Sequence, residues 1–282
     1  MKNYAFIAYR NWAFNIFKKL NKIKKNFIIL TPNHNFKNYK NIIYIDPKDN
    51  KKNFQILKKN KIDVVFFYGW SWIISKEIID NFLCICLHPS KLPEYRGGSP
   101  IQNQIINNVK DSAVTIFKMN MKIDGGDIYQ QKKLSLKNTL KKIFYRIENI
   151  GAKITNNFLK DFEKNKIKFS KQEKIGKIYK RRSPLESCIN INKIKKKNYE
   201  FFFNFIRMLQ DPYPNPYFIT AKKIIYIYKI KKIHISQNRY EKSLDQMTIK
   251  KGLYLKLKDG YAKILAGKEI TNYDNIKKKR NL

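Results

Sequence analysis

The sequence contains only three cysteines, Cys84, Cys86 and Cys188, among its 282 residues. Three thiols cannot form a disulfide framework, and the chain has no CxxC pair of the kind that holds a structural metal. A reducing environment therefore fits best, so we expect a cytoplasmic protein without a metal.

Long hydrophobic runs are also missing. The longest, residues 62–74, contains Asp63 and falls well short of the roughly 18 residues that span a bilayer. The apolar part of residues 1–9 is too short for a signal peptide. We therefore expect a chain with no membrane contact.

The glycine motifs that hold phosphates are absent. Neither GxGxxG nor GxxxxGK[ST] occurs, and the first apolar run ends instead in Ala8-Tyr9-Arg10-Asn11-Trp12. Ordinary NAD or FAD binding and kinase-like phosphate loops are therefore disfavoured.

Acidic residues are scarce, because 21 Asp and Glu stand against 60 Lys and Arg, a formal net charge of +39. Such a charge suggests nucleic acid, since clustered cations release counterions when they meet phosphates. Only eight of the cations are arginine, the residue suited to bidentate phosphate recognition. Lys, Asn and Ile are abundant together, as AT-rich coding DNA would produce. We therefore interpret most of the charge as a solvated lysine surface.

The first part of the chain alternates short apolar runs with amphipathic segments, the pattern of βαβ units and a parallel sheet. We expect an α/β domain over residues 1–180, with an open, mostly parallel Rossmann-like sheet. The predicted strands are 4–9, 26–31, 41–46, 63–68, 82–87, 113–119 and 127–134. The predicted helices are 11–20, 51–60, 100–108 and 138–164.

A different pattern follows the Arg181-Arg182-Ser183-Pro184 turn. One predicted helix, 197–209, precedes three prolines within residues 211–216, which exclude both helix and central strand there. Short β-like runs follow at 223–230, 252–257 and 261–265, the last two joined by an Asp259-Gly260 turn. We expect a small, β-rich, barrel-like domain over 181–282, with a frayed tail from 275.

The loop His88-Pro89-Ser90-Lys91-Leu92-Pro93-Glu94-Tyr95-Arg96-Gly97-Gly98-Ser99-Pro100 carries the strongest signal. It follows a predicted buried strand, and ligands of open α/β sheets bind at the carboxyl ends of strands. Histidine is the side chain best suited to exchange a proton near neutral pH. His88 is therefore the candidate acid or base, whereas His34 and His234 stand in polar or lysine-rich surroundings and are predicted at the surface.

A second turn, Asp124-Gly125-Gly126-Asp127-Ile128, lies between two β-like runs. Alone it is weak evidence, because Asp and Gly populate turns for conformational reasons. Together, the HPSxLPxYRGxxPIQ loop and the DxGDI turn resemble the 10-formyltetrahydrofolate-dependent formyltransferase family. That family includes methionyl-tRNA, glycinamide ribonucleotide and sugar N-formyltransferases.

The resemblance implies a catalytic set of Asn-x-His plus the Asp of DxG. In this chain His88 and Asp124 match, but Cys86 stands at the asparagine position. A thiol is a much weaker donor than an amide, so another group replaces the amide donor or the activity is altered. A nucleophilic role for Cys86 is disfavoured, since the family chemistry needs no covalent intermediate.

The resemblance also implies a mechanism and a folate site. An acceptor amine attacks the formyl carbon, protonated His88 donates to the oxyanion, and Asp124 supports His88 and helps remove the amine proton. The cofactor-binding set that it implies comprises Ser71, Trp72, Ile73, Ile74, Leu87, Met119, Met121 and Ile123. The acceptor-binding set comprises Tyr95, Arg96, Gly97 and Ser99.

The acceptor is expected to be a small amine, most simply a nucleotide-linked amino sugar. Glycinamide ribonucleotide enzymes have a single domain, and only residues 32–40 follow the second strand, where tRNA-formylating relatives have a basic insertion. The alternative is methionyl-tRNA formylation, supported by the charge. A second alternative is an inactive folate- or nucleic-acid-binding homologue, suggested by Cys86. A homodimer is left open.

Overall fold

The computed structural model describes residues 2–20, 26–36, 41–173, 176–220, 222–234, 249–250 and 252–271. The chain divides into two compact units, residues 1–100 with 110–180 and residues 101–109 with 181–282. The sequence analysis assigns 101–109 to the first domain, whereas the structure groups them with the second unit. Asn204 Nδ2 donates to Asn108 Oδ1 at 3.3 Å, which joins this segment to the second unit.

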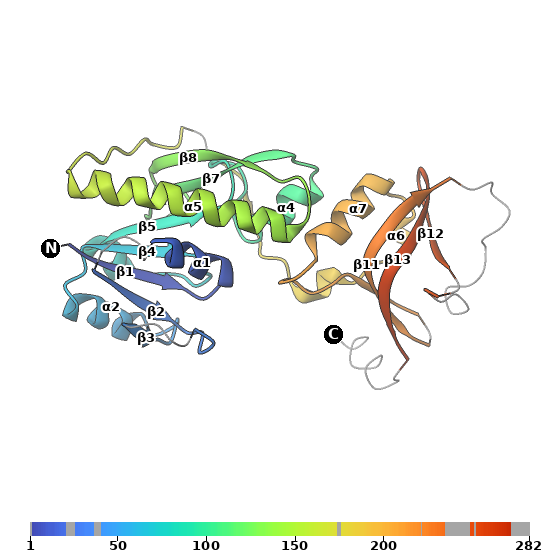
Figure 1. Ribbon diagram of the computed structural model, residues 1–282, viewed down its shortest axis with the longest axis horizontal. Helices are drawn as coiled ribbons and strands as arrows, with labels where there is room; N and C mark the ends of the chain where they lie inside the picture. The colour runs from blue at the N-terminus through green and yellow to red at the C-terminus, as the bar shows by residue number, and fades with distance from the viewer. Residues whose placement is uncertain are drawn as a thin grey trace. The chain divides into compact units, whose positions relative to one another are not determined.

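The first unit is built on a seven-stranded sheet of order β3-β2-β1-β4-β5-β7-β8 (Figure 1). Strands β1 to β5 are parallel, and β7 and β8 each run antiparallel to their neighbour. The prediction of an open, mostly parallel sheet is therefore confirmed. Its strands are β1 (Asn3–Ala8), β2 (Asn26–Thr31), β3 (Ile42–Tyr44), β4 (Val64–Tyr68), β5 (Leu83–His88), β7 (Asp111–Lys118) and β8 (Ile128–Ser135).

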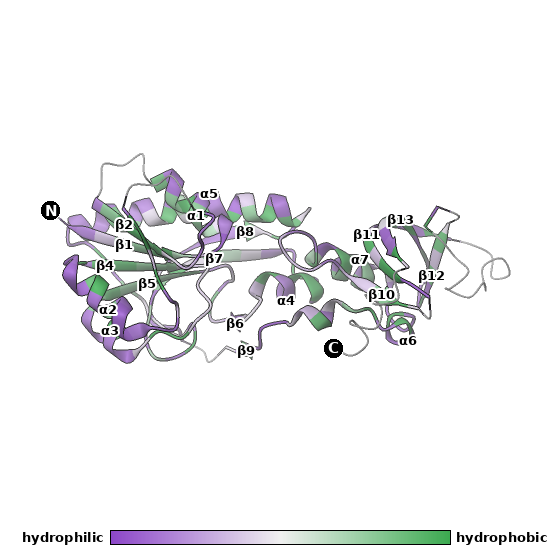
Figure 2. Cartoon of the chain, turned by 90° about the horizontal axis from the view of Figure 1, so that it is seen from below, coloured by the Kyte–Doolittle hydropathy of each residue, from purple (hydrophilic) through white to green (hydrophobic). Residues whose placement is uncertain are grey.

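Helices cover both faces of this sheet (Figures 1 and 2). Helices α1 (Asn11–Leu20) and α5 (Leu140–Glu163) lie on one face, and α2 (Asn50–Lys59) and α3 (Lys76–Asn81) on the other. Both faces of β4 are buried throughout, which explains its continuous apolar sequence VVFFY. Figure 2 shows the hydrophobic colour concentrated in these strands and the hydrophilic colour on outer helix faces.

Side-chain caps fix where several helices begin. Thr139, Asp49 and Ser75 accept hydrogen bonds from backbone N–H groups in the first turns of α5, α2 and α3. Such caps satisfy donors that have no partner within the helix. Helix α3 follows β4 closely and was not expected from the sequence, because its six residues are too few for a clear period.

The second unit is a four-stranded antiparallel half-barrel sheet, of order β10-β11-β13-β12. Its strands are β10 (Tyr217–Ile219), β11 (Ile224–Ile233), β12 (Leu253–Leu257) and β13 (Gly260–Ile270). Its helical elements are α4 (Pro100–Ile106), η1 (Pro184–Ser187), α6 (Ile191–Ile194) and α7 (Tyr199–Met208). Phe202 and Ile206 of α7 pack with Phe218, Ile225 and the other strand residues in one core.

The prediction of a barrel-like, β-rich second part is confirmed. A turn joins β12 to β13 as expected, but it is formed by Lys258 and Asp259, because Gly260 is the first residue of β13 and pairs with Leu257. Strand β10 was not predicted, because it directly follows the proline-rich segment and has only three residues. The predicted frayed tail from residue 275 lies outside the described residues.

Candidate active site

His88 is the last residue of β5, and only 5% of it is exposed. The loop after it is fixed by hydrogen bonds from its own strand neighbours. Thr115 Oγ1, opposite His88 on β7, donates to the Ser90 carbonyl at 2.6 Å, and Gln131 Nε2 of β8 donates to the Leu92 carbonyl at 2.8 Å. The loop therefore holds one conformation beside the histidine.

Both ring nitrogens of His88 have a partner. Nε2 lies 2.8 Å from the Tyr95 carbonyl oxygen, and Nδ1 lies 3.4 Å from Asp124 Oδ2. A carbonyl can only accept, so Nε2 carries the hydrogen in this arrangement. Nδ1 faces the Asp124 carboxylate.

Asp124 is held by the backbone of the His88 loop. Its Oδ2 accepts from the Gly97 N–H at 2.7 Å. The side chain is 18% exposed. Asp124 also adopts a left-handed φ of 46°, a conformation that Asp tolerates better than most residues.

The turn that carries Asp124 requires glycine at position 126. A Cβ atom there would lie 1.7 Å from the Lys118 carbonyl oxygen, and no side-chain rotation could relieve that contact with the backbone. Lys118 N–H donates to the Asp127 carbonyl at 2.8 Å, which closes the turn against the end of β7. The spacing of the DGGD turn thus serves backbone packing as well as the carboxylate.

Cys86 shares a sheet face with His88, since side chains alternate along a strand. The thiol is half-buried, and its pKa is raised well above the ordinary value, first by desolvation and then by the negative charge of Asp124. It is therefore a neutral thiol near pH 7. A neutral thiol is a weak hydrogen-bond donor and a poor nucleophile, which favours the non-covalent interpretation.

Gln172 was not predicted from the sequence, yet its side chain joins both halves of the site. Its Nε2 donates to the carbonyls of Asp124 and Gly126 at 2.9 and 2.7 Å. Its Oε1 accepts from Arg96 Nε and Nη2 at 3.2 and 2.5 Å. A glutamine in a lysine-rich loop about fifty residues after the turn gives no sequence signal of this role.

The predicted folate-binding residues fall into two groups. Ile73, Met121 and Ile123 expose 86%, 58% and 57% of their surface. Ser71 and Trp72 lie beside Tyr9, with 2.6 Å between the two hydroxyl oxygens and 4.8 Å between the two ring centroids. These five side chains are accessible to a ligand.

The remaining three are directed into the protein. Ile74 is buried in the core between the sheet and α2 and α3, and Met119 packs against that core. Leu87 is buried on the opposite face of the sheet, against α5. Its Cδ1 lies so close to Gly151 of α5 that a Cβ atom added there would be only 2.8 Å away. Side-chain contact between these residues and folate therefore stays a prediction.

The predicted acceptor-binding residues surround the histidine loop. Arg96 is 7% exposed and its guanidinium is engaged by Gln172, so it is a structural link more than a free cation. The Tyr95 ring stacks on the Tyr179 ring, with 5.0 Å between the two ring centroids. Gly97 and Ser99 have left-handed φ values of 85° and 52°. Whether these residues contact an acceptor stays a prediction.

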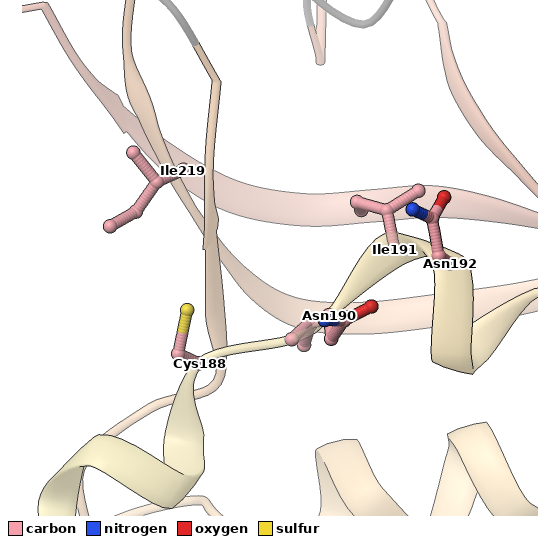
Figure 3. A pocket seen from close by; sticks show the side chains of 6 residues that line it. Cys188, Asn190, Ile191, Asn192 and Ile219 are labelled. Carbon is pink, nitrogen blue, oxygen red and sulfur yellow. The ribbon is translucent and has the colours of Figure 1, made fainter. Parts of the chain in front are cut away.

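Other features of the sequence lie apart from this set. His34 and His234 are exposed. A cavity of about 470 Å³ in the second unit is lined by Cys188, Ile189, Asn190, Ile191, Asn192 and Ile219 (Figure 3). It contains one thiol and no carboxylate or imidazole, so it offers none of the groups that His88 and Asp124 combine.

Among the described residues, no cluster of three His, Cys, Asp or Glu side chains could hold a metal ion. None of the described helices, α5 included, has both the length and the apolar character needed to cross a membrane.

The open α/β sheet places His88 at a strand end with Asp124 beside it, and comparisons with known proteins identify the family. The sequence profile described as Formyl transferase matches residues 20–156. The chain is 30% identical to methionyl-tRNA formyltransferase of Campylobacter lari, over 98% of each chain. It is 28% identical to the Rickettsia canadensis enzyme of that name over 66% of this chain, a match that spans only 61% of the relative.

Solved structures share the fold. A methionyl-tRNA formyltransferase from Clostridium thermocellum superposes with a TM-score of 0.68 and 24% identity, covering 96% of this chain and 100% of the other. A 4-N formyltransferase from Francisella tularensis has a TM-score of 0.63 and 22% identity, covering 78% and 93%. The chain belongs to the formyltransferase family, whose members transfer one-carbon groups.

Proposed function

We propose that this protein transfers a formyl group from 10-formyltetrahydrofolate to the amino group of methionyl-tRNA. The observation that carries the proposal is the end-to-end match with the Campylobacter lari enzyme, which includes the second unit. A sugar N-formyltransferase from Shewanella covers only 78% of this chain. These coverages favour the tRNA acceptor over the amino sugar expected from the sequence alone.

The residues at the strand ends fit a folate donor. Ile73, Met121 and Ile123 are large apolar side chains that are largely exposed, so a flat, largely apolar heterocycle can pack against them. In the proposed reaction, folate supplies the formyl carbon that the acceptor amine attacks.

His88 and Asp124 provide the proton transfers. The positive charge of protonated His88 stabilises the negative charge that develops on the formyl oxygen, and its Nδ1 proton passes to the departing nitrogen. Asp124 Oδ2 keeps the ring in place, and the partly exposed carboxylate accepts a proton from the attacking amine directly or through water. Cys86 is a weak donor, so the oxyanion role is assigned to the charge of His88, whose two nitrogens face Tyr95 and Asp124.

The half-barrel offers a surface for phosphates. Lys231 of β11 lies directly opposite Lys263 of β13, although like charges paired across an antiparallel ladder destabilise it. Lys229 is exposed on the same strand. A polyanion bound there would remove the repulsion and would make the affinity depend steeply on salt.

The experiment compares binding of initiator methionyl-tRNA by the wild type and by Lys231→Glu/Lys263→Glu at several salt concentrations. The double variant is expected to raise the KM for the tRNA and to reduce the slope of log K against log salt by about 2, one unit per phosphate contact. The control is Lys51→Glu/Lys52→Glu on exposed positions of α2, which keeps the wild-type slope. Equal slopes for all three proteins would contradict this surface.

The competing acceptor is a nucleotide-linked amino sugar, and one observation favours it. Only residues 32–41 connect β2 to β3, so there is no long basic insertion at that place. The same assay therefore includes such a sugar as a second acceptor. Formylation of the sugar without formylation of the tRNA would overturn the proposed acceptor and leave the chemistry of His88 in place.

A further inference from the structure

Two described stretches, residues 166–173 and 176–180, contact the DGGD turn, the start of β8 and the His88 loop. Ser170 exchanges two backbone hydrogen bonds with Ile128, at 2.8 and 2.9 Å. Further on, β9 (Ile178–Tyr179) pairs in parallel with β6 (Arg96–Gly97), and the Gly98 N–H donates to the Tyr179 carbonyl at 2.7 Å. Gln172 lies between these two attachments, and the side chain reaches both loops.

The amide of Gln172 is fully used. Both hydrogens of Nε2 are directed at carbonyls on either side of Gly125, and Oε1 receives two N–H groups of Arg96. Only a side chain with two donors and one acceptor on adjacent atoms can make all four contacts. A glutamate of the same size would keep the Arg96 contact and would lose both donors.

The two carbonyls belong to the turn of Asp124. Asp124 has a left-handed φ of 46°, a conformation that persists only where its surroundings impose it. Its carboxylate reaches both His88 Nδ1 and the Gly97 N–H from this conformation. Without the clamp, by which we mean the four hydrogen bonds of the Gln172 amide, the turn would relax and the Asp124 carboxylate would lose its position.

Arg96 connects the same clamp to the other ring nitrogen. It directly follows Tyr95, whose carbonyl binds His88 Nε2. A single side chain therefore fixes the backbone next to both partners of the histidine. We propose that Gln172 is a positioning residue for formyl transfer, one that holds Asp124 and the Tyr95–Arg96 backbone at the two nitrogens of His88. This inference rests on the proposed role of His88 and Asp124.

The test compares Gln172→Leu and Gln172→Glu with Gln55→Glu, an exposed position on α2 that changes charge in the same way. Both Gln172 variants are expected to lower kcat for formyl transfer by about 10², because small displacements of catalytic groups have effects of that size. The KM for 10-formyltetrahydrofolate is expected to stay within about threefold, since Gln172 contacts none of the exposed apolar side chains. Gln55→Glu keeps the wild-type kcat.

A spectroscopic readout separates positioning from general destabilisation. The Gly97 amide proton bonds to Asp124 Oδ2, so its chemical shift reports where the carboxylate lies. In the free protein, the shift is expected to move in both Gln172 variants and to stay unchanged in Gln55→Glu. The Gly97 signal could move in the Gln172 variants while the wild type formylates none of the acceptors. That result would contradict the proposed function and support the positioning role of Gln172.

The inference is overturned if kcat in either Gln172 variant stays within about threefold of the wild type. It is also overturned if kcat falls while the Gly97 signal does not move. If the leucine variant does not fold, the isosteric glutamate variant decides. Failure of both to fold would assign Gln172 a structural role only and would reject the proposal.

Discussion

His88 contacts a carbonyl through one ring nitrogen and a carboxylate through the other. Nε2 faces the Tyr95 carbonyl, and Nδ1 faces Asp124 Oδ2. Replacing His88 by Ala removes both ring nitrogens, and Asp124→Asn replaces the carboxylate that faces Nδ1 by a neutral amide. Each is expected to lower kcat/KM by about 10² to 10³, measured with labelled formyl donor. An active enzyme that tolerates both changes would place the chemistry elsewhere.

Cys86 is the residue where this chain departs from the family pattern. Cys86→Asn introduces an amide that can donate to the formyl oxygen, so formyl transfer is expected to stay the same or to rise. The matched control is Cys188→Asn, because Cys188 lines the cavity of the second unit. A loss of more than about tenfold in Cys86→Asn alone would mean that the thiol has a role of its own.

The buried thiols give a pH dependence of stability. Burial raises the pKa of Cys84 to about 12 and that of Cys86 well above its usual range. Because the unfolded chain releases these protons near pH 8.5, stability is fully present below that pH and falls as the pH rises toward the folded values. Denaturant titrations from pH 7 to 10 should show this loss, and Cys86→Asn should reduce it. A steeper loss in that variant would contradict the assignment.

The sequence predicts the site residues that carry chemistry better than those that support them. His88 and Asp124 stand in short, unusual motifs, and the structure brings them within 3.4 Å. Gln172 acts through distant backbone carbonyls, a relation that only the fold creates. Leu87 and Ile74 are buried by strand alternation and helix packing, and their expected contact with folate stays a prediction.

At the scale of elements, long periodic segments were predicted closely and short ones were not. The predicted helix 138–164 corresponds to α5 (Leu140–Glu163), and the predicted helix 11–20 to α1. Strands β6 and β9 have two residues each and follow from tertiary contact between loops. No local pattern could indicate them, since neither strand is long enough to alternate.

The DGGD turn gives a prediction for one element. Gly126→Ala would place a methyl group 1.7 Å from the Lys118 carbonyl, so the turn or the end of β7 must move. We expect a loss of stability of about 1–3 kcal/mol by denaturant titration and a loss of activity of at least about tenfold. Gly125→Ala is the comparison, because its nearest contact, with Lys122 Cβ at 2.8 Å, is less severe than the 1.7 Å contact at Gly126. Equal effects of the two substitutions would contradict the described packing of Gly126.

For the whole molecule, the charge of +39 has a different meaning once the second unit is considered. Composition alone indicated a solvated lysine surface, of the kind that AT-rich coding DNA would produce. The half-barrel places Lys231 and Lys263 opposite each other, and the match with the Campylobacter lari enzyme extends across both units. The charge therefore supports a polyanionic acceptor. Neither the length of the β2–β3 loop nor the composition could decide between tRNA and an amino sugar.

The most direct test of the account measures transfer of labelled formyl from 10-formyltetrahydrofolate by the full chain. Methionyl-tRNA and a nucleotide-linked amino sugar are offered separately, with His88→Ala as the control. We expect formylmethionyl-tRNA from the wild type, and at least about 10² less from His88→Ala. Folate binding without transfer to either acceptor, or transfer that does not depend on His88, would contradict the central claim.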